Sequence, residues 1–216
     1  MAGHANYGAG TGHGYAATIG GDYGSYHHNL LAHNEGRNWS MSGGLDGGGS
    51  YAGHHDMFNN VCYNWRNRTT DGGTHQGQFV NNYYKMGPAT THTYLLTADL
   101  EGTGKGSQSY YVSGNIRENR NGSLTTDKEN VTYRVNAEQK YDWDVFVDKP
   151  FFESYATIEP AKLAYKTTLS DVGCNQPFFD NHDTRMVKET LTGTYTYKGN
   201  RTGYPGLIDK ESDSEG

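Results

Sequence analysis

A short stretch near the front of the chain gathers residue types that can do acid–base and anion-binding chemistry. Residues 26–42 read YHHNLLAHNEGRNWSMS, with three histidines, one glutamate and one arginine around the apolar run Leu30–Ala32. This run, bounded by polar residues, predicts a short strand, and residues 34–38 predict the loop that leaves it. Strands that deliver polar side chains to loops commonly carry active sites. The alternative is that these histidines are surface and turn residues of a histidine-rich chain.

Composition indicates which elements must position this stretch. The chain has 216 residues, enough for a single domain, with 30 glycines, 18 tyrosines, 5 prolines and a hydrophobic fraction of 33%. These features disfavour a helical bundle and favour a β-rich fold with many turns. No apolar run approaches the length of a membrane span, and residues 1–21 lack the basic and apolar regions of a signal peptide. We therefore expect no membrane partner.

A small asparagine-containing unit recurs along the front half of the chain. Four asparagines precede apolar or aromatic runs at intervals of 31, 22 and 33 residues: Asn29, Asn60, Asn82 and Asn115. Recurrence at such periods predicts stacked coils, in which asparagines at equivalent bends hydrogen-bond one another. We expect stacked parallel strands over residues 15–120, in an all-β, right-handed parallel β-helix with coils over about residues 12–120. The alternative is an antiparallel meander in which asparagine merely marks turns.

The back of the chain, about residues 121–216, has a different pattern and predicts a capping region of the same domain, which spans residues 1–216. Residues 160–169 (PAKLAYKTTL) have an amphipathic helical pattern that begins with proline. Residues 183–191 (DTRMVKETL) predict a second short helix, with Asp183 as its N-cap. We expect these short C-terminal helices to lie on the outside of the coils or to cap their end.

Charge is distributed unevenly along the chain. Residues 1–92 hold 4 basic and 5 acidic side chains and nine of the ten histidines, whereas residues 93–216 hold 14 basic and 19 acidic side chains, or −5 of the net −6. No basic patch of the kind that binds nucleic acid is present, so we expect no nucleic-acid partner. A polyanion would meet the front half of the chain and be repelled by the back half.

Cysteines and glycosylation motifs leave alternatives open. Cys62 and Cys174 are as consistent with a bridge as with two thiols, because sequence cannot place them within bonding distance. The number of N-x-S/T sequons is too close to chance to establish a secreted glycoprotein. These sequons begin at Asn38, Asn67, Asn121, Asn130 and Asn200.

Three segments carry a resemblance to a known family. The runs YHHNLLAHNEGRN, FNNVCYNW and FVNNYYKMGPAT resemble the second half of pectate lyases of polysaccharide lyase family 1. The resemblance implies a secreted, right-handed parallel β-helix that cleaves de-esterified homogalacturonan, an acidic polysaccharide, by calcium-dependent β-elimination. It also implies that the Ca²⁺ ligands belong to a part of the family fold that precedes this stretch, so we expect no metal ligand among these residues. One departure is that the family follows its catalytic arginine with Asn-Pro-Arg, where this chain has Asn38, Trp39 and Ser40.

The resemblance also assigns roles to individual residues. Arg37 takes the position of the catalytic base that removes the C5 proton of the uronate. A guanidinium rarely loses its proton, so this role requires a crowded cationic site, and the same side chain is suited to bind a carboxylate as a fork. His28 and His33 are substrate-binding candidates and alternative bases, since a neutral imidazole suits proton abstraction near pH 7. Arg66 and Arg68 are expected to bind sugar carboxylates further along the groove, unless they are solvated loop residues.

Three classes of function compete. The leading one is a pectate-type lyase. A hydrolase on the same scaffold would need paired carboxylates, and Asp56 and Asp71 are too isolated in the sequence to suggest a pair. The third class is a non-catalytic carbohydrate-binding or structural β-helix fragment. Under each of them, an unpaired strand edge on the first coil predicts association through the N-terminal end.

Overall fold

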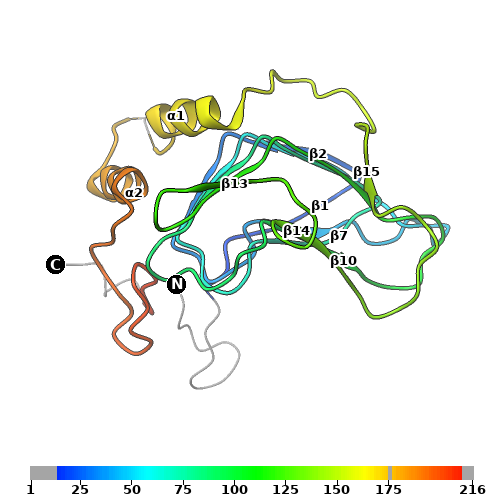
Figure 1. Cartoon of the computed structure of the whole chain (residues 1–216), viewed down its shortest axis with the longest axis horizontal. Helices are drawn as coiled ribbons and strands as arrows, with labels where there is room; N and C mark the ends of the chain where they lie inside the picture. Colours follow the sequence, from blue (N-terminus) through cyan, green and yellow to red (C-terminus); the bar gives the residue numbers. More distant parts are fainter. Residues whose placement is uncertain (1–13, 175–176, 211–216) are drawn as a thin grey trace.

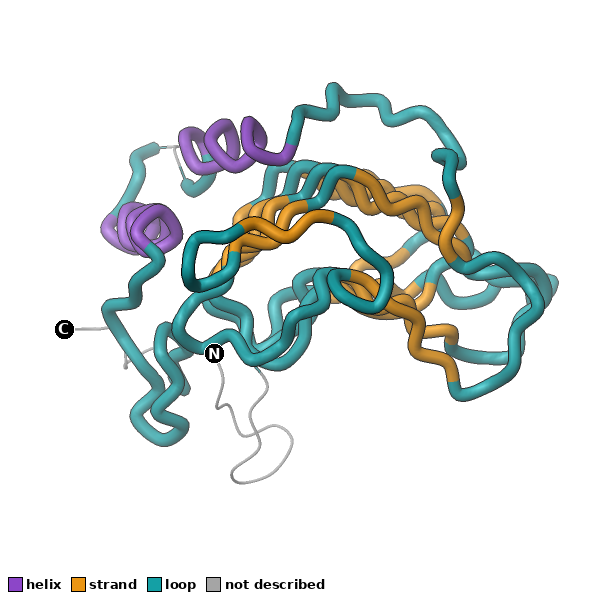
Figure 2. Tube along the Cα trace, viewed as in Figure 1, coloured by secondary structure: helices purple, strands orange, loops and turns teal. Residues whose placement is uncertain are grey.

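The computed structural model describes residues 14–174 and 177–210, which are mostly sheet, with three sheets of five strands and two short helices (Figures 1 and 2). The first sheet contains β1 (Thr18–Gly20), β4 (Ser40–Ser42), β7 (Thr70–Gly73), β10 (Leu96–Leu100) and β14 (Tyr133–Ala137). The second contains β2 (Tyr23–His27), β5 (His54–Phe58), β8 (Gln76–Val80), β11 (Ser109–Ser113) and β15 (Phe146–Val147). The third contains β3 (Leu30–Ala32), β6 (Val61–Tyr63), β9 (Tyr83–Lys85), β12 (Ile116–Glu118) and β13 (Leu124–Thr126).

Strands that follow one another in the sequence belong to different sheets. From β1 to β12 the chain passes through the first, second and third sheets in turn, and each strand pairs with the strand of the next pass, as β2 pairs with β5 and β5 with β8. Figure 2 shows the strands of successive passes as stacked layers. The pairings are parallel except that of β12 with β13. The predicted parallel pairing is confirmed, and the antiparallel meander is wrong for these sheets.

The repeated asparagines form a ladder at the bend between the second and third sheets. The side-chain Nδ2 of Asn29 donates to Oδ1 of Asn60 at 3.0 Å, Asn60 donates to Asn82 at 3.1 Å, and Asn82 donates to Asn115 at 2.9 Å. The three later asparagines are 2% exposed or less, so each amide replaces water for its neighbour. The predicted register of these asparagines is therefore confirmed.

The residue before each ladder asparagine explains how the chain turns there. These four residues adopt positive φ values between 50° and 73°, in the left-handed region that glycine and asparagine tolerate best: His28, Asn59, Asn81 and Gly114. A left-handed residue bends the chain sharply within one step, and the next asparagine then satisfies the backbone of the bend. The sequence unit is thus a turn residue followed by a ladder residue.

Side chains of the first sheet alternate between the core and the opposite face. Ile19, Met41 and Ala98 point into the hydrophobic core with residues of the other sheets, among them Phe79 and Tyr110. Because neighbouring strand residues point to opposite faces, the residues beside them form a polar row across the other face. In register order, this row is Thr18, Ser40, Asp71, Thr97 and Arg134.

Two helices lie outside the sheets (Figure 1). Helix α1 (Ala161–Asp171) packs against β6 and β9 of the third sheet, and α2 (Asn181–Thr192) follows it. Both predicted helices are present, but the predicted cap of the second one is wrong. Asp180 is the N-cap, and Asp183 occupies the third helical position of a capping box with it. Within the described ranges, no helix is long and apolar enough to cross a membrane.

The structure decides two of the open sequence questions. Cys62 is fully buried in the core with a thiol whose pKa burial raises, and it does not bond to Cys174, which is exposed. The Asn38 side chain is also fully buried, which excludes this sequon from glycosylation in the folded protein. The other four sequons begin at exposed asparagines: Asn67, Asn121, Asn130 and Asn200.

Candidate functional site

Arg37 lies in the loop that joins β3 to β4, at the edge where strands of the first sheet begin. Its backbone has φ 54°, and its half-buried side chain places the guanidinium carbon 4.9 Å from the ring centroid of Tyr15. Nη1 donates a long hydrogen bond of 3.5 Å to Oγ1 of Thr18, the first residue of β1. Within residues 14–174 and 177–210, no carboxylate oxygen lies within 4.0 Å of this guanidinium.

Arg68 occupies the equivalent loop of the next pass, between β6 and β7. Its guanidinium carbon lies 5.4 Å from the same Tyr15 ring, so two cations share one aromatic side chain. Nε and Nη2 donate to the two carboxylate oxygens of Asp71 at 2.7 and 2.8 Å. This fork, above all its hydrogen bonds, raises the pKa of Arg68. Arg68 is therefore a permanent cation held in a fixed position beside Arg37.

Arg66 lies two residues earlier in the same loop. Its guanidinium carbon is 3.6 Å from the ring centroid of Tyr204, and Nη1 is 3.7 Å from Oε1 of Glu35. The other oxygen of Glu35 accepts from the backbone N–H of Gly14 at 3.5 Å. The structure thus places the three predicted arginines on adjacent loops at one edge of the first sheet, two of them paired with carboxylates.

The sequence analysis missed three further residues at this edge, which come from the next two passes of the chain: His92, Tyr94 and Arg134. The guanidinium carbon of Arg134 lies 4.4 Å from the ring centroid of Tyr94, and the ring of His92 lies 5.6 Å from the same ring. Burial lowers the pKa of His92, and the positive charges of Arg134 and Arg68 lower it further. A neutral imidazole therefore sits among cations at this edge. Counting back from the start of each strand of the first sheet would have found Tyr94, which precedes β10 as Arg68 precedes β7.

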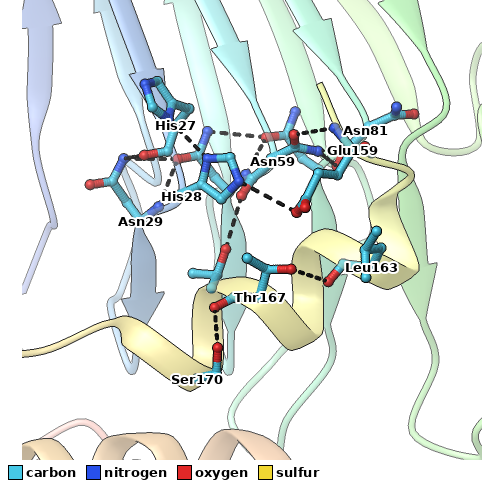
Figure 3. A network of polar contacts seen from close by, with 12 residues as sticks. His27, His28, Asn29, Asn59, Asn81, Glu159, Leu163, Thr167 and Ser170 are labelled. Carbon is cyan, nitrogen blue, oxygen red and sulfur yellow. Dashed lines mark hydrogen bonds and ion pairs between the residues drawn. The ribbon is translucent and has the colours of Figure 1, made fainter. Parts of the chain in front are cut away.

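His28 lies in a different part of the molecule from Arg37. It occupies the bend between the second and third sheets, where its Nε2 is 3.6 Å from a carboxylate oxygen of Glu159 (Figure 3). Its Nδ1 is 2.9 Å from Nδ1 of His27, whose pKa is lowered by burial and by the neighbouring His28. The structure therefore places His28 and Arg37 at different bends of the chain, and the substrate-binding role expected for His28 stays a prediction.

His33 is buried beneath the second helix. Only 7% of the residue is exposed, its Nε2 lies 2.7 Å from a carboxylate oxygen of Glu189 in α2, and its Nδ1 accepts from Nδ2 of Asn64 at 2.8 Å. The prediction that His33 binds substrate is wrong, because both ring nitrogens are engaged inside the protein. The ring instead fastens α2 to the loop after β3.

The carboxylates near Arg37 do not fit calcium. Ca²⁺ takes six to eight oxygen ligands, usually from several carboxylates with open oxygens. Both oxygens of Asp71 accept from Arg68, and Glu35 is shared between Arg66 and a backbone N–H. Over the whole described part of the chain, no group of three or more His, Cys, Asp and Glu side chains is arranged to hold a metal ion.

The carboxylates also fail to form the pair that a hydrolase needs. Asp56 is buried in the second sheet, where it accepts from the hydroxyl of Ser154 and from Gln78 at 3.1 Å. Asp71 belongs to the first sheet and is occupied by Arg68. The two acids face different surroundings, so this pair gives no support to glycoside hydrolysis by an acid and a base.

Comparison of the chain with known proteins found no related family. No model of a protein family matches the chain, and no curated protein matches it. The candidate site is named the arginine edge, and it consists of Arg37, Arg66, Arg68 and Arg134 with Tyr15, Tyr94 and His92.

Proposed function

We propose that this protein is a pectate-lyase-like polysaccharide lyase that cleaves an acidic polysaccharide of the homogalacturonan type by β-elimination. In this proposal the three sheets form a right-handed parallel β-helix, and the protein acts as a secreted enzyme. The Asn29–Asn115 ladder and the rotation of the chain through three parallel sheets support the fold. The arginine edge supports the substrate class, because guanidinium groups bind carboxylates as planar forks.

The observation that carries the proposal is the unequal pairing of the arginines. Arg68 is neutralised by Asp71 and Arg66 lies beside Glu35, whereas Arg37 faces Tyr15 and Thr18 only, among residues that the structure describes. A guanidinium without a protein carboxylate is the one best able to take a carboxylate from a substrate. Arg37 is therefore the residue at which a uronate should bind.

β-Elimination at a uronate breaks the C5–H bond and the C4–O bond and leaves a C4–C5 double bond. Positive charge next to the uronate carboxylate stabilises the enolate that forms as C5 loses its proton. Arg37 supplies this charge at the reacting unit, whereas the charge of Arg68 beside it is offset by the Asp71 carboxylate. The family resemblance gives the proton-accepting role to Arg37, but a guanidinium that keeps its charge to bind the carboxylate cannot also accept the C5 proton. The departing O4 takes a proton from water. His92 is the chemically easier base of the arginine edge, because burial and, after it, the nearby arginines lower its pKa and favour the neutral form.

The test is elimination on polygalacturonate, followed by the ultraviolet absorbance of the unsaturated uronide. Arg37→Lys keeps the charge but loses the fork, and we expect the rate to fall by at least about 100-fold. Arg201→Lys, at an exposed position far along the chain, is the matched control and should retain the parental rate. His92→Gln, assayed in parallel, identifies the base: loss of elimination with retained binding would assign the proton transfer to the imidazole.

A second candidate function is carbohydrate binding without catalysis. The pairing of Arg66 and Arg68 with carboxylates favours it, since this pairing leaves less positive charge for the transition state. Retention on polygalacturonate in affinity electrophoresis, without any unsaturated product with Ca²⁺ or with chelator, would establish this function. New reducing ends without unsaturation would instead point to a hydrolase and contradict both proposals.

A further inference from the structure

A pocket opens at the other edge of the first sheet, where its strands end. Its volume is about 690 Å³, and its walls come from the loops that join the first sheet to the second. These loops lie at the right of Figure 2, at the opposite end of the view from α2 in Figure 1. The pocket contains two histidines, His54 and His75, together with Asp22 and Asp46. None of these residues belongs to the arginine edge.

The hydrogen bonds of His54 determine which of its nitrogens is open. Nδ1 lies 3.2 Å from the backbone oxygen of Asp22 and 3.3 Å from a carboxylate oxygen of the same residue. Because both partners only accept, Nδ1 carries the hydrogen and Nε2 carries a lone pair when the ring is neutral. The ring stacks on Tyr23 at 4.3 Å with an angle of 8° between planes, which limits its rotation.

His75 is oriented in the same way. Its Nδ1 lies 2.7 Å from the backbone oxygen of Ser107, so this nitrogen also donates and Nε2 is left with the lone pair. No hydrogen bond to Nε2 of either ring occurs among the described residues. The centroids of the two rings are 5.5 Å apart, and the planes are nearly perpendicular, at 88°.

We propose that His54 and His75 form a binding site for a divalent transition metal of the zinc type. Metal-binding histidines almost always donate their other ring N–H to a carboxylate or backbone carbonyl, and both rings do so here. Two imidazoles on one tetrahedral ion, with metal–nitrogen distances of about 2.0–2.1 Å, place their centroids roughly 5 Å apart, close to the spacing seen. The site supplies two protein ligands, and water or a bound anion supplies the others.

The charge of the pocket and its chemistry both favour this class of ion. Asp22 and Asp46 contribute two negative charges against one positive charge from Lys105, whose Nζ donates to the backbone oxygen of Gly48 at 3.3 Å. Imidazole nitrogen prefers zinc, copper and nickel over calcium or magnesium. The neighbouring His55 is excluded as a ligand, because it is fully buried and its Nε2 faces the backbone oxygen of Gly21 at 3.3 Å.

The experiment is titration of the full chain with Zn²⁺, followed by calorimetry and by the imidazole ¹⁵N chemical shifts. His4 and His13 are replaced by Gln in all samples, so that metal at those imidazoles does not enter the measurement. We expect one Zn²⁺ per chain and selective shifts of Nε2 in His54 and His75. His54→Gln and His75→Gln should each abolish this binding, and Asp22→Asn should weaken it by about 10-fold through the lost orientation of His54.

His182→Gln, at the exposed start of α2, is the control and should bind Zn²⁺ as the parent does. Zn²⁺ that shifts neither ring nitrogen, or binding unchanged in His54→Gln, would overturn the proposal. The ¹⁵N shifts of the parent chain give this answer even if a variant fails to fold, because they report each imidazole in the intact protein.

Discussion

At the scale of single residues, the histidines of this protein differ in their surroundings. His33 is buried against a carboxylate, His92 lies among arginines, and His54 and His75 each donate to an oxygen atom at one pocket. Their spacing in the sequence alone does not indicate which role each histidine has. Their different partners decide that one fastens a helix, one is suited to accept a proton, and two are suited to bind a metal.

The fully buried ring of His55 predicts a pH dependence of stability. Burial lowers its pKa below the ordinary 6.5, so the unfolded chain binds this proton more readily than the folded protein does. The stabilising contribution is complete above about pH 6.5 and is lost as the pH falls through the lower folded value. We expect the free energy of unfolding, measured with urea between about pH 8 and pH 5, to decrease on acidification.

The contribution of His55 to this dependence can be isolated. His27 and His92 also have lowered pKa values and act in the same direction, so His55→Gln should make the slope shallower without abolishing it. His182→Gln removes an exposed imidazole and serves as the comparison. An unchanged slope in His55→Gln would contradict this assignment.

At the scale of elements, the sequence predicted what local patterns determine. The ladder asparagines and both helices follow from recurrence and from helical periodicity, and the structure contains them. The N-cap of α2 was misplaced because residues 180–183 (DNHD) offer two aspartates, and only the geometry of the capping box distinguishes them. Pairings between distant segments, such as His33 with Glu189, leave no local pattern and could not be predicted.

The same limit applies to the candidate site. Arg37, Arg66 and Arg68 could be chosen from the sequence because one motif and its repeat contain them. Arg134 joins them through the register of the first sheet, in which it stands opposite Thr97 and Thr97 opposite Asp71, and Tyr15 and His92 join them through contacts with the arginines and Tyr94. Register and such contacts are properties of the folded chain, so these three residues became visible only in the structure.

The ladder predicts a graded cost of asparagine substitution. Asn82 accepts from the backbone and side chain of Asn60 and donates to Asn115 and to the backbone oxygen of Met57, all within the core. Asn82→Ala should lower the free energy of unfolding by about 3 kcal/mol, because each buried group left unsatisfied costs about 1–3 kcal/mol. Asn29→Ala, at the half-buried end of the ladder, should cost about 1 kcal/mol. Equal losses at both positions, in urea unfolding, would contradict a role for burial.

The attachment of α2 predicts the effect of removing His33. The side chains of His33 and Glu189 are each 3% exposed. His33→Ala therefore leaves a buried carboxylate that keeps the backbone N–H of Thr196, at 2.8 Å, and the more distant Arg185, at 3.6 Å. We expect a loss of about 3 kcal/mol in the free energy of unfolding, as for other broken buried pairs. His28→Ala removes a half-exposed partner of Glu159 and should cost less than about 1 kcal/mol. Faster hydrogen exchange confined to α2 would locate the effect.

At the scale of the whole molecule, the three sheets share one open side. Strands β1, β2 and β3 each stand at the end of their sheet, and no strand of the described chain pairs with their outer edges. In β2 the exposed side chains include Tyr23, at 74% exposure, beside Ser25 and His27. Unpaired N–H and C=O groups next to an exposed aromatic ring are a template for pairing with a further strand.

This edge predicts that the chain associates with other copies as its concentration rises. A lysine on an edge strand opposes such pairing, because association would bury its charge. We expect Ser25→Lys to shift the protein toward the monomer in light scattering, while Ser170→Lys, which adds the same charge to the exposed face of α1, should leave association unchanged. A parent chain that stays monomeric at high concentration, or equal effects of the two lysines, would show that the edge of β2 does not drive association. A selective effect of Ser25→Lys would instead identify the pairing strand, because only that lysine lies where the backbone groups of the first pass are open.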